Sequence, residues 1–205
     1  MVHKYVFRVL PRMMLSVAAV ALPNTAVSDV PADLSAELSM AVPARQWRTI
    51  VLHHSATAEG DVASIDAVHR QQKDSAGNPW LGIGYHFVVG NGQRMGDGEV
   101  RATFRWRGQM AGAHAGRRDQ NEHGIGICLI GNFETTPPTP KQLAALTDLL
   151  KNLSTRYAIT RTHVLRHQDV RSTLCPGRLF PWEQMLATVP VEAVPEEHVP
   201  EGHDS

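Results

Sequence analysis

An imidazole and a thiolate lie close together in the stretch His167-Gln-Asp-Val-Arg-Ser-Thr-Leu-Cys175-Pro-Gly177. A metal ion bound by both groups and by a distant third ligand would constrain the arrangement of the whole chain. Both groups are good zinc ligands. A catalytic zinc site needs a third protein ligand and an open position for water. The best candidate for that ligand is His53, far upstream in Ile50-Val-Leu-His-His-Ser-Ala-Thr57. A shared ion would require a fold that brings these distant segments together.

The first of these ligands is predicted at the end of a strand. Residues 47–54 are rich in β-forming side chains and end in the pair His53-His54. Open α/β sheets carry their chemistry at the carboxyl ends of strands. Neighbouring strand residues face opposite sides, so only one histidine of the pair can point into a given site. Further strands are expected at residues 80–90, 102–107, 125–130 and 162–166, with an Asn91-Gly92 hairpin turn.

Capping signals predict the helices. Asp61 can cap a helix over residues 62–73, and Thr139-Pro-Lys-Gln142 is a capping box with proline in the first helical turn. The leucines that follow Gln142 lie on one helical face. A closing helix is expected near residues 180–186. The glycine- and histidine-rich residues 108–124, which include His114, are expected to form a long loop.

Composition limits the possible classes. A chain of 205 residues with a formal net charge of zero fits one soluble domain and gives nucleic-acid binding no electrostatic support. The two cysteines, Cys128 and Cys175, exclude a disulfide scaffold but allow one bridge. Cys128 lies in an apolar run, where a buried free thiol is the expected state.

The two ends of the chain differ from the middle. A basic start, the short apolar run Met13–Leu22 and small residues before Asp29 are typical of a secretory signal peptide. We therefore expect export to the periplasm or the extracellular space, with no stable membrane insertion after cleavage near Ser28; an uncleaved anchor is the alternative. The expected organisation is a signal peptide (1–28), a linker or short helix (29–45), the zinc domain (46–188) and a disordered acidic tail (189–205).

Four motifs in order resemble those of the type-2 N-acetylmuramoyl-L-alanine amidases, a superfamily that includes phage lysozyme-amidases and peptidoglycan recognition proteins. The resemblance extends from about Trp47 to Met185. The motifs are Leu52-His-His-Ser-Ala-Thr57, Gly84-Tyr-His-Phe87, Gly124-Ile-Gly-Ile-Cys-Leu-Ile-Gly-Asn-Phe133 and the stretch His167–Gly177.

The resemblance implies an α/β fold: a single domain with a mixed central sheet flanked by helices and a groove that holds one Zn²⁺. The implied zinc ligands are His53, His167 and Cys175. Tyr85 and Thr173 are implied as catalytic hydroxyl donors; phage members carry a lysine at the threonine position. We expect His54, His86 and His114 near the substrate, with peptidoglycan or muropeptides as partners of a monomer.

The resemblance implies hydrolysis of the amide bond between N-acetylmuramic acid and L-alanine. The cytoplasmic recycling branch carries a glutamate where this chain has Cys128, and an aspartate as third zinc ligand, so the chain departs from that branch. Three other interpretations remain open at this point. They are a non-catalytic peptidoglycan-binding module, a phage-type endolysin with an uncleaved N-terminal anchor, and a structural zinc protein.

Overall fold

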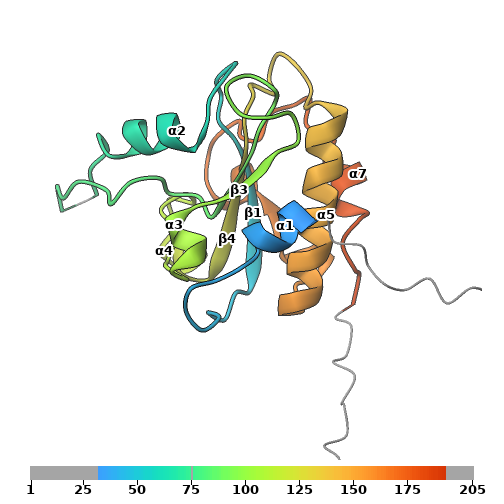
Figure 1. Cartoon of the computed structure of the whole chain (residues 1–205), viewed down its shortest axis with the longest axis horizontal. Helices are drawn as coiled ribbons and strands as arrows, with labels where there is room; N and C mark the ends of the chain where they lie inside the picture. Colours follow the sequence, from blue (N-terminus) through green and yellow to red (C-terminus); the bar gives the residue numbers. More distant parts are fainter. Residues whose placement is uncertain (1–31, 75, 193–205) are drawn as a thin grey trace, which may run out of the picture.

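A five-stranded sheet with strand order β3-β2-β4-β1-β5 forms the centre of the molecule (Figure 1). The computed structural model describes residues 32–74 and 76–192. β1, β2, β4 and β5 pair in parallel, and β3 runs antiparallel to β2, so the expected mixed sheet is confirmed. The strands are β1 (Thr49–His54), β2 (Phe87–Val89), β3 (Val100–Ala102), β4 (Gly124–Leu129) and β5 (Val164–Arg166).

Helices cover both sides of the sheet. Figure 1 shows α5 and α7 on one side and α2 on the other. The helices are α1 (Ala32–Glu37), α2 (Val62–His69), α3 (Phe104–Arg107), α4 (Arg118–His123), α5 (Pro140–Tyr157), α6 (His167–Val170) and α7 (Trp182–Leu186); a short 3-10 helix spans Arg161–His163. Every helix in the described part of the chain is too short or too polar to cross a bilayer.

β1 and β4 lie at the centre of the sheet and all of their residues are buried. Alternate residues of each strand face opposite sides. Ile50 and Leu52 of β1 pack into the main core with the leucines of α5. A smaller core on the α2 side includes Val88 and Ile130. β1 therefore presents His53 on the face opposite the main core, as its alternation requires.

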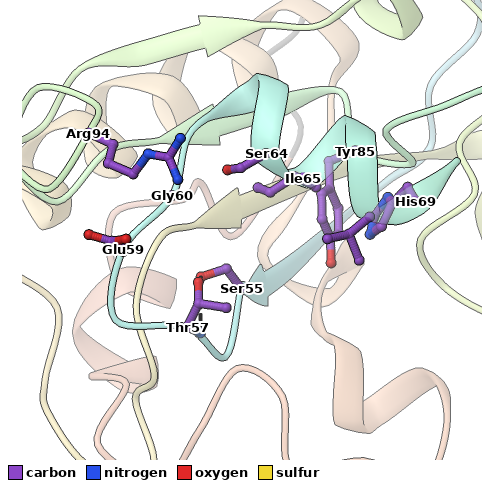
Figure 2. A pocket seen from close by; sticks show the side chains of 10 residues that line it. Ser55, Thr57, Glu59, Gly60, Ser64, Ile65, His69, Tyr85 and Arg94 are labelled. Carbon is purple, nitrogen blue, oxygen red and sulfur yellow. Dashed lines mark hydrogen bonds between the residues drawn. The ribbon is translucent and has the colours of Figure 1, made fainter. Parts of the chain in front are cut away.

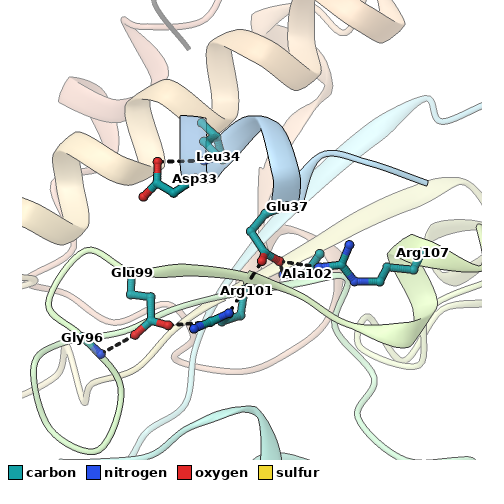
Figure 3. A network of polar contacts seen from close by, with 8 residues as sticks. All are labelled: Asp33, Leu34, Glu37, Gly96, Glu99, Arg101, Ala102 and Arg107. Carbon is teal, nitrogen blue, oxygen red and sulfur yellow. Dashed lines mark hydrogen bonds and ion pairs between the residues drawn. The ribbon is translucent and has the colours of Figure 1, made fainter. Parts of the chain in front are cut away.

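The segment expected as a linker or short helix contains α1, which is bound to the domain (Figure 3). Leu34 is buried in the main core. Glu37 accepts hydrogen bonds from the Ala102 backbone N–H at 2.6 Å and from the Arg107 guanidinium at 2.9 Å. Its other oxygen lies 3.8 Å from Arg101. One carboxylate thus fastens α1 to β3 and α3.

Two of the strand predictions give the wrong residue ranges. Residues 80–86 are not a strand, because the backbone N–H groups of Ile83 and Gly84 donate to the side chains of Asp66 and His69. The strand expected over 102–107 ends at Ala102. A turn of helix follows because the Thr103 side chain accepts from the Arg105 N–H.

Three further expectations are corrected. The helix expected over 62–73 ends at His69, and the expected loop 108–124 contains α4. β2 and β3 do form an antiparallel pair, but ten residues connect them, so Asn91-Gly92 is not a two-residue hairpin turn. Val189 is buried in the main core. The segment expected as a signal peptide (1–28) and most of the segment expected as an acidic tail lie outside the described residues.

Candidate metal centre

The sheet topology brings the three candidate ligands together. β1 and β5 are parallel neighbours, so their carboxyl ends lie side by side. His53 is the penultimate residue of β1, and His167 follows β5 directly as the first residue of α6. The chain then returns to Cys175, whose carbonyl accepts a hydrogen bond from the Gln168 N–H at 2.9 Å. The short helix α6 occupies the first part of this segment.

The donor atoms of these residues converge. One ring nitrogen each of His53 and His167 and the sulfur of Cys175 lie within 4.8 Å of one another. His53 Nδ1 is 3.8 Å from Cys175 Sγ. His167 Nε2 is buried and has no hydrogen-bond partner in the described part of the chain. A buried nitrogen without a partner is costly unless a ligand binds it. Two imidazoles and a thiol suit Zn²⁺, so the group could hold a metal ion.

The environment keeps both histidines in the neutral form that binds metals. Burial, followed by the facing rings of His114 and His167, holds the pKa of His53 well below its ordinary value. Burial and Arg171 lower the pKa of His167. Burial raises the pKa of the Cys175 thiol to about 12. Metal binding at neutral pH must therefore displace a proton from sulfur.

Two hydroxyl-bearing residues neighbour the three ligand candidates. The Tyr85 ring is 5.0 Å from the His53 ring between centroids. Burial and the neighbouring thiols of Cys128 and Cys175 raise the pKa of Tyr85 well above its usual value, so its hydroxyl stays a proton donor. Thr173 is half-buried on the loop before Cys175, and its hydroxyl accepts the Cys175 N–H at 3.3 Å.

The rings of His54 and His86 have backbone hydrogen-bond partners. His54 Nδ1 accepts the Phe133 N–H at 3.2 Å, and the His54 N–H donates to Cys175 Sγ at 3.3 Å. His86 is fully buried; its Nδ1 accepts the Gly126 N–H, and its Nε2 lies 3.0 Å from the Met110 carbonyl. Both ring nitrogens of the buried His86 thus have partners within the protein.

His114 lies behind His53 instead of on the surface of a loop. It is 7% exposed, and its Nδ1 is 3.0 Å from His53 Nε2. This position is suited to orienting His53.

Two further observations concern neighbouring groups. Cys128 and Cys175 are both free, as expected for Cys128. Asp169 forms an ion pair with Arg166 at 2.8 Å.

A cavity of about 180 Å³ adjoins the donor group through Tyr85. Figure 2 shows Tyr85 and His69 at one end of this cavity and Glu59 and Arg94 at the other. The His69 and Tyr85 rings are 5.3 Å apart. His69 is the last residue of α2 and was not among the site residues expected from the sequence. The cavity is lined by Ser55, Thr57, Glu59, Gly60, Ser64, Ile65, Val68, His69, Tyr85 and Arg94.

Comparison with known proteins adds independent findings. The family model described as N-acetylmuramoyl-L-alanine amidase matches residues 43–178. The chain is 34% identical to peptidoglycan-recognition protein SC2 of Drosophila melanogaster over 133 residues, which cover 62% of this chain and 66% of that protein. It is 35% identical to an N-acetylmuramoyl-L-alanine amidase of Sus scrofa over 131 residues, 62% of this chain but 20% of the pig protein. The chain therefore spans slightly less than two thirds of the insect relative.

A solved structure agrees in fold as well as in sequence. The N-acetylmuramoyl-L-alanine amidase LysC from Clostridium intestinale URNW aligns with a TM-score of 0.58 at 34% identity. The alignment covers 73% of this chain and 91% of that one. Since the family model matches well over half of the residues of this chain, the chain belongs to the N-acetylmuramoyl-L-alanine amidase family.

Proposed function

We propose that this protein is a zinc-dependent N-acetylmuramoyl-L-alanine amidase that hydrolyses the amide bond between N-acetylmuramic acid and L-alanine in peptidoglycan or muropeptides. The observation that carries the proposal is the convergence of His53, His167 and Cys175, with a buried His167 nitrogen that lacks a partner. Three protein donors suit an open catalytic zinc site, whereas structural zinc sites usually have four.

Zinc held by these donors would supply a Lewis acid and a water molecule activated near neutral pH. Tyr85 would donate a hydrogen bond from its hydroxyl to the oxygen of the scissile carbonyl as negative charge develops there. Thr173 is the second candidate donor. A hydroxyl is a weaker electrophile than the lysine ammonium of phage members, so more of the charge stabilisation would fall to the metal.

The cavity beside Tyr85 provides room for part of the substrate. Its lining combines hydroxyl groups, an imidazole, one guanidinium and one carboxylate with apolar side chains. Ligand sites of this kind bury an apolar surface and orient the ligand with a few polar groups. The names of the relatives support the substrate class, since one is a peptidoglycan-recognition protein and two are muramoyl-alanine amidases.

The experiment that tests this function is mass spectrometry of a muramyl-tripeptide incubated with the purified zinc-loaded protein. The expected products are free tripeptide and N-acetylmuramic acid. A chelator should abolish them, and so should Cys175→Ala. Cys128→Ala is the matched control: it removes the other free thiol, and we expect it to retain zinc. Intact substrate in the presence of zinc-loaded protein would contradict catalysis and favour a peptidoglycan-binding module.

The cellular location is part of the same proposal. The pattern of residues 1–28 favours export to the periplasm or the extracellular space, where peptidoglycan is accessible. Amino-terminal sequencing of the mature protein would test this. Cleavage near Ser28 is the expected result, and retention of residues 1–28 would favour the anchored endolysin.

A further inference from the structure

A chain of hydrogen bonds connects a backbone carbonyl in the sheet to the donor group. His114 Nε2 lies 3.2 Å from the Gly124 carbonyl oxygen. His114 Nδ1 lies 3.0 Å from His53 Nε2. The opposite nitrogen, His53 Nδ1, faces Cys175 Sγ at 3.8 Å. The Gly124 carbonyl, the His114 ring and the His53 ring thus form a series that leads to the Cys175 sulfur.

The carbonyl fixes the direction of every bond in this chain. A carbonyl oxygen can only accept, so His114 Nε2 must carry the proton. In a neutral imidazole the other nitrogen is then an acceptor, so His114 Nδ1 must accept from His53 Nε2–H. His53 Nδ1 is left with a free lone pair. That lone pair points toward Cys175, where a metal shared by the two residues would bind.

The fold holds the His114 ring in this position. Gly112 and Gly126 lie against the ring, and a Cβ at either position would overlap the imidazole. The side chain of Asn121 accepts from the N–H groups of both His114 and Ala115 at 2.9 Å. The ring therefore has little freedom to turn away from His53.

We propose that His114 is a positioning residue: it selects the His53 tautomer whose Nδ1 lone pair binds the metal, and it takes its own orientation from the Gly124 carbonyl. This role rests on the zinc site of the proposed function. It differs from substrate contact, which was expected for His114 from the sequence. Groups that hydrogen-bond to the far nitrogen of a metal-binding histidine fix its tautomer and orientation.

The zinc affinity of two His114 variants tests the proposal without reference to activity. His114→Leu removes the acceptor, and we expect the zinc Kd to rise by roughly 10–100-fold. His114→Asn places an amide oxygen near the former Nδ1, and we expect most of the affinity to return. His163→Leu, at an exposed histidine in the 3-10 helix, is the control and should bind zinc as the wild type does.

A second measurement keeps the proposal testable if the leucine variant does not fold. Long-range ¹H–¹⁵N spectra of the metal-free wild-type protein should show the His53 proton on Nε2. A proton on Nδ1 would overturn the proposal, as would equal zinc affinity of folded His114→Leu and wild type. Failure of the wild-type protein to bind zinc would overturn the zinc site itself, which separates the two failures.

Discussion

At the level of the residue, the clearest division of roles is between the metal donors and Tyr85. The Tyr85 ring lies 5.0 Å from that of His53, yet Tyr85 is not one of the three converging donors. We expect Tyr85→Phe to lower kcat by roughly 10²–10³, as removal of one oxyanion donor does elsewhere. The zinc content should not change.

The measurement for this prediction is steady-state kinetics together with metal analysis of the same samples. Tyr157→Phe is a matched control, because the Tyr157 hydroxyl contacts Met40 Sδ at 3.6 Å, away from the donor group. Loss of zinc in Tyr85→Phe would contradict the assigned role, since it would indicate that the ring supports the ligands rather than the reaction.

At the level of the element, α5 shows how a local signal stabilises the fold. The Thr139 hydroxyl accepts a hydrogen bond from the Gln142 backbone N–H at 3.0 Å, and the Gln142 side chain accepts one from the Thr139 backbone N–H. The Thr139 hydroxyl also donates to Asp97 at 2.5 Å, which connects the helix start to the segment between β2 and β3. We expect Thr139→Ala to lower the free energy of unfolding by about 1–2 kcal/mol.

Denaturant unfolding followed by circular dichroism would measure this loss. Lys151→Ala, at an exposed position of the same helix, should change the free energy of unfolding by less than about 0.5 kcal/mol. Equal effects of the two substitutions would show that the cap and its bond to Asp97 contribute little.

At the level of the whole molecule, buried neutral histidines make stability depend on pH. Burial, followed by the nearby His114, holds the pKa of His86 well below its ordinary value. Below about pH 6.5 the unfolded chain binds a proton that native His86 does not, so stability falls as the pH decreases. One such histidine lowers the free energy of unfolding by at most about 1.4 kcal/mol per pH unit.

Denaturant unfolding of the metal-free protein between pH 5.0 and 7.5 would measure this dependence. The expected result is a plateau above pH 7 and a decline below pH 6.5, with a smaller slope in His86→Gln. This window lies above the ordinary titration range of carboxylates, so their contribution is small. Equal stability at pH 5.0 and 7.5 would contradict the prediction.

Local patterns in the sequence predicted much of this protein. β-forming side chains predicted β1, a strand was expected at residues 125–130 where β4 lies, and the capping box with its leucine stripe predicted α5. These signals are local because they depend on side-chain alternation, capping and helical periodicity. The motifs also named His53, His167 and Cys175 as a set, and the structure brings their donor atoms together.

Only the tertiary structure decided the features that these local patterns could not predict. Strand expectations failed at residues 80–86, where distant side chains of α2 take the backbone N–H groups. The role of His114 depends on a carbonyl in β4 and on space left by two glycines, neither of which a loop pattern reveals. The physical reason is the same in both cases. A hydrogen-bond partner far away in the chain changes what a residue does, and only the folded chain brings that partner within reach.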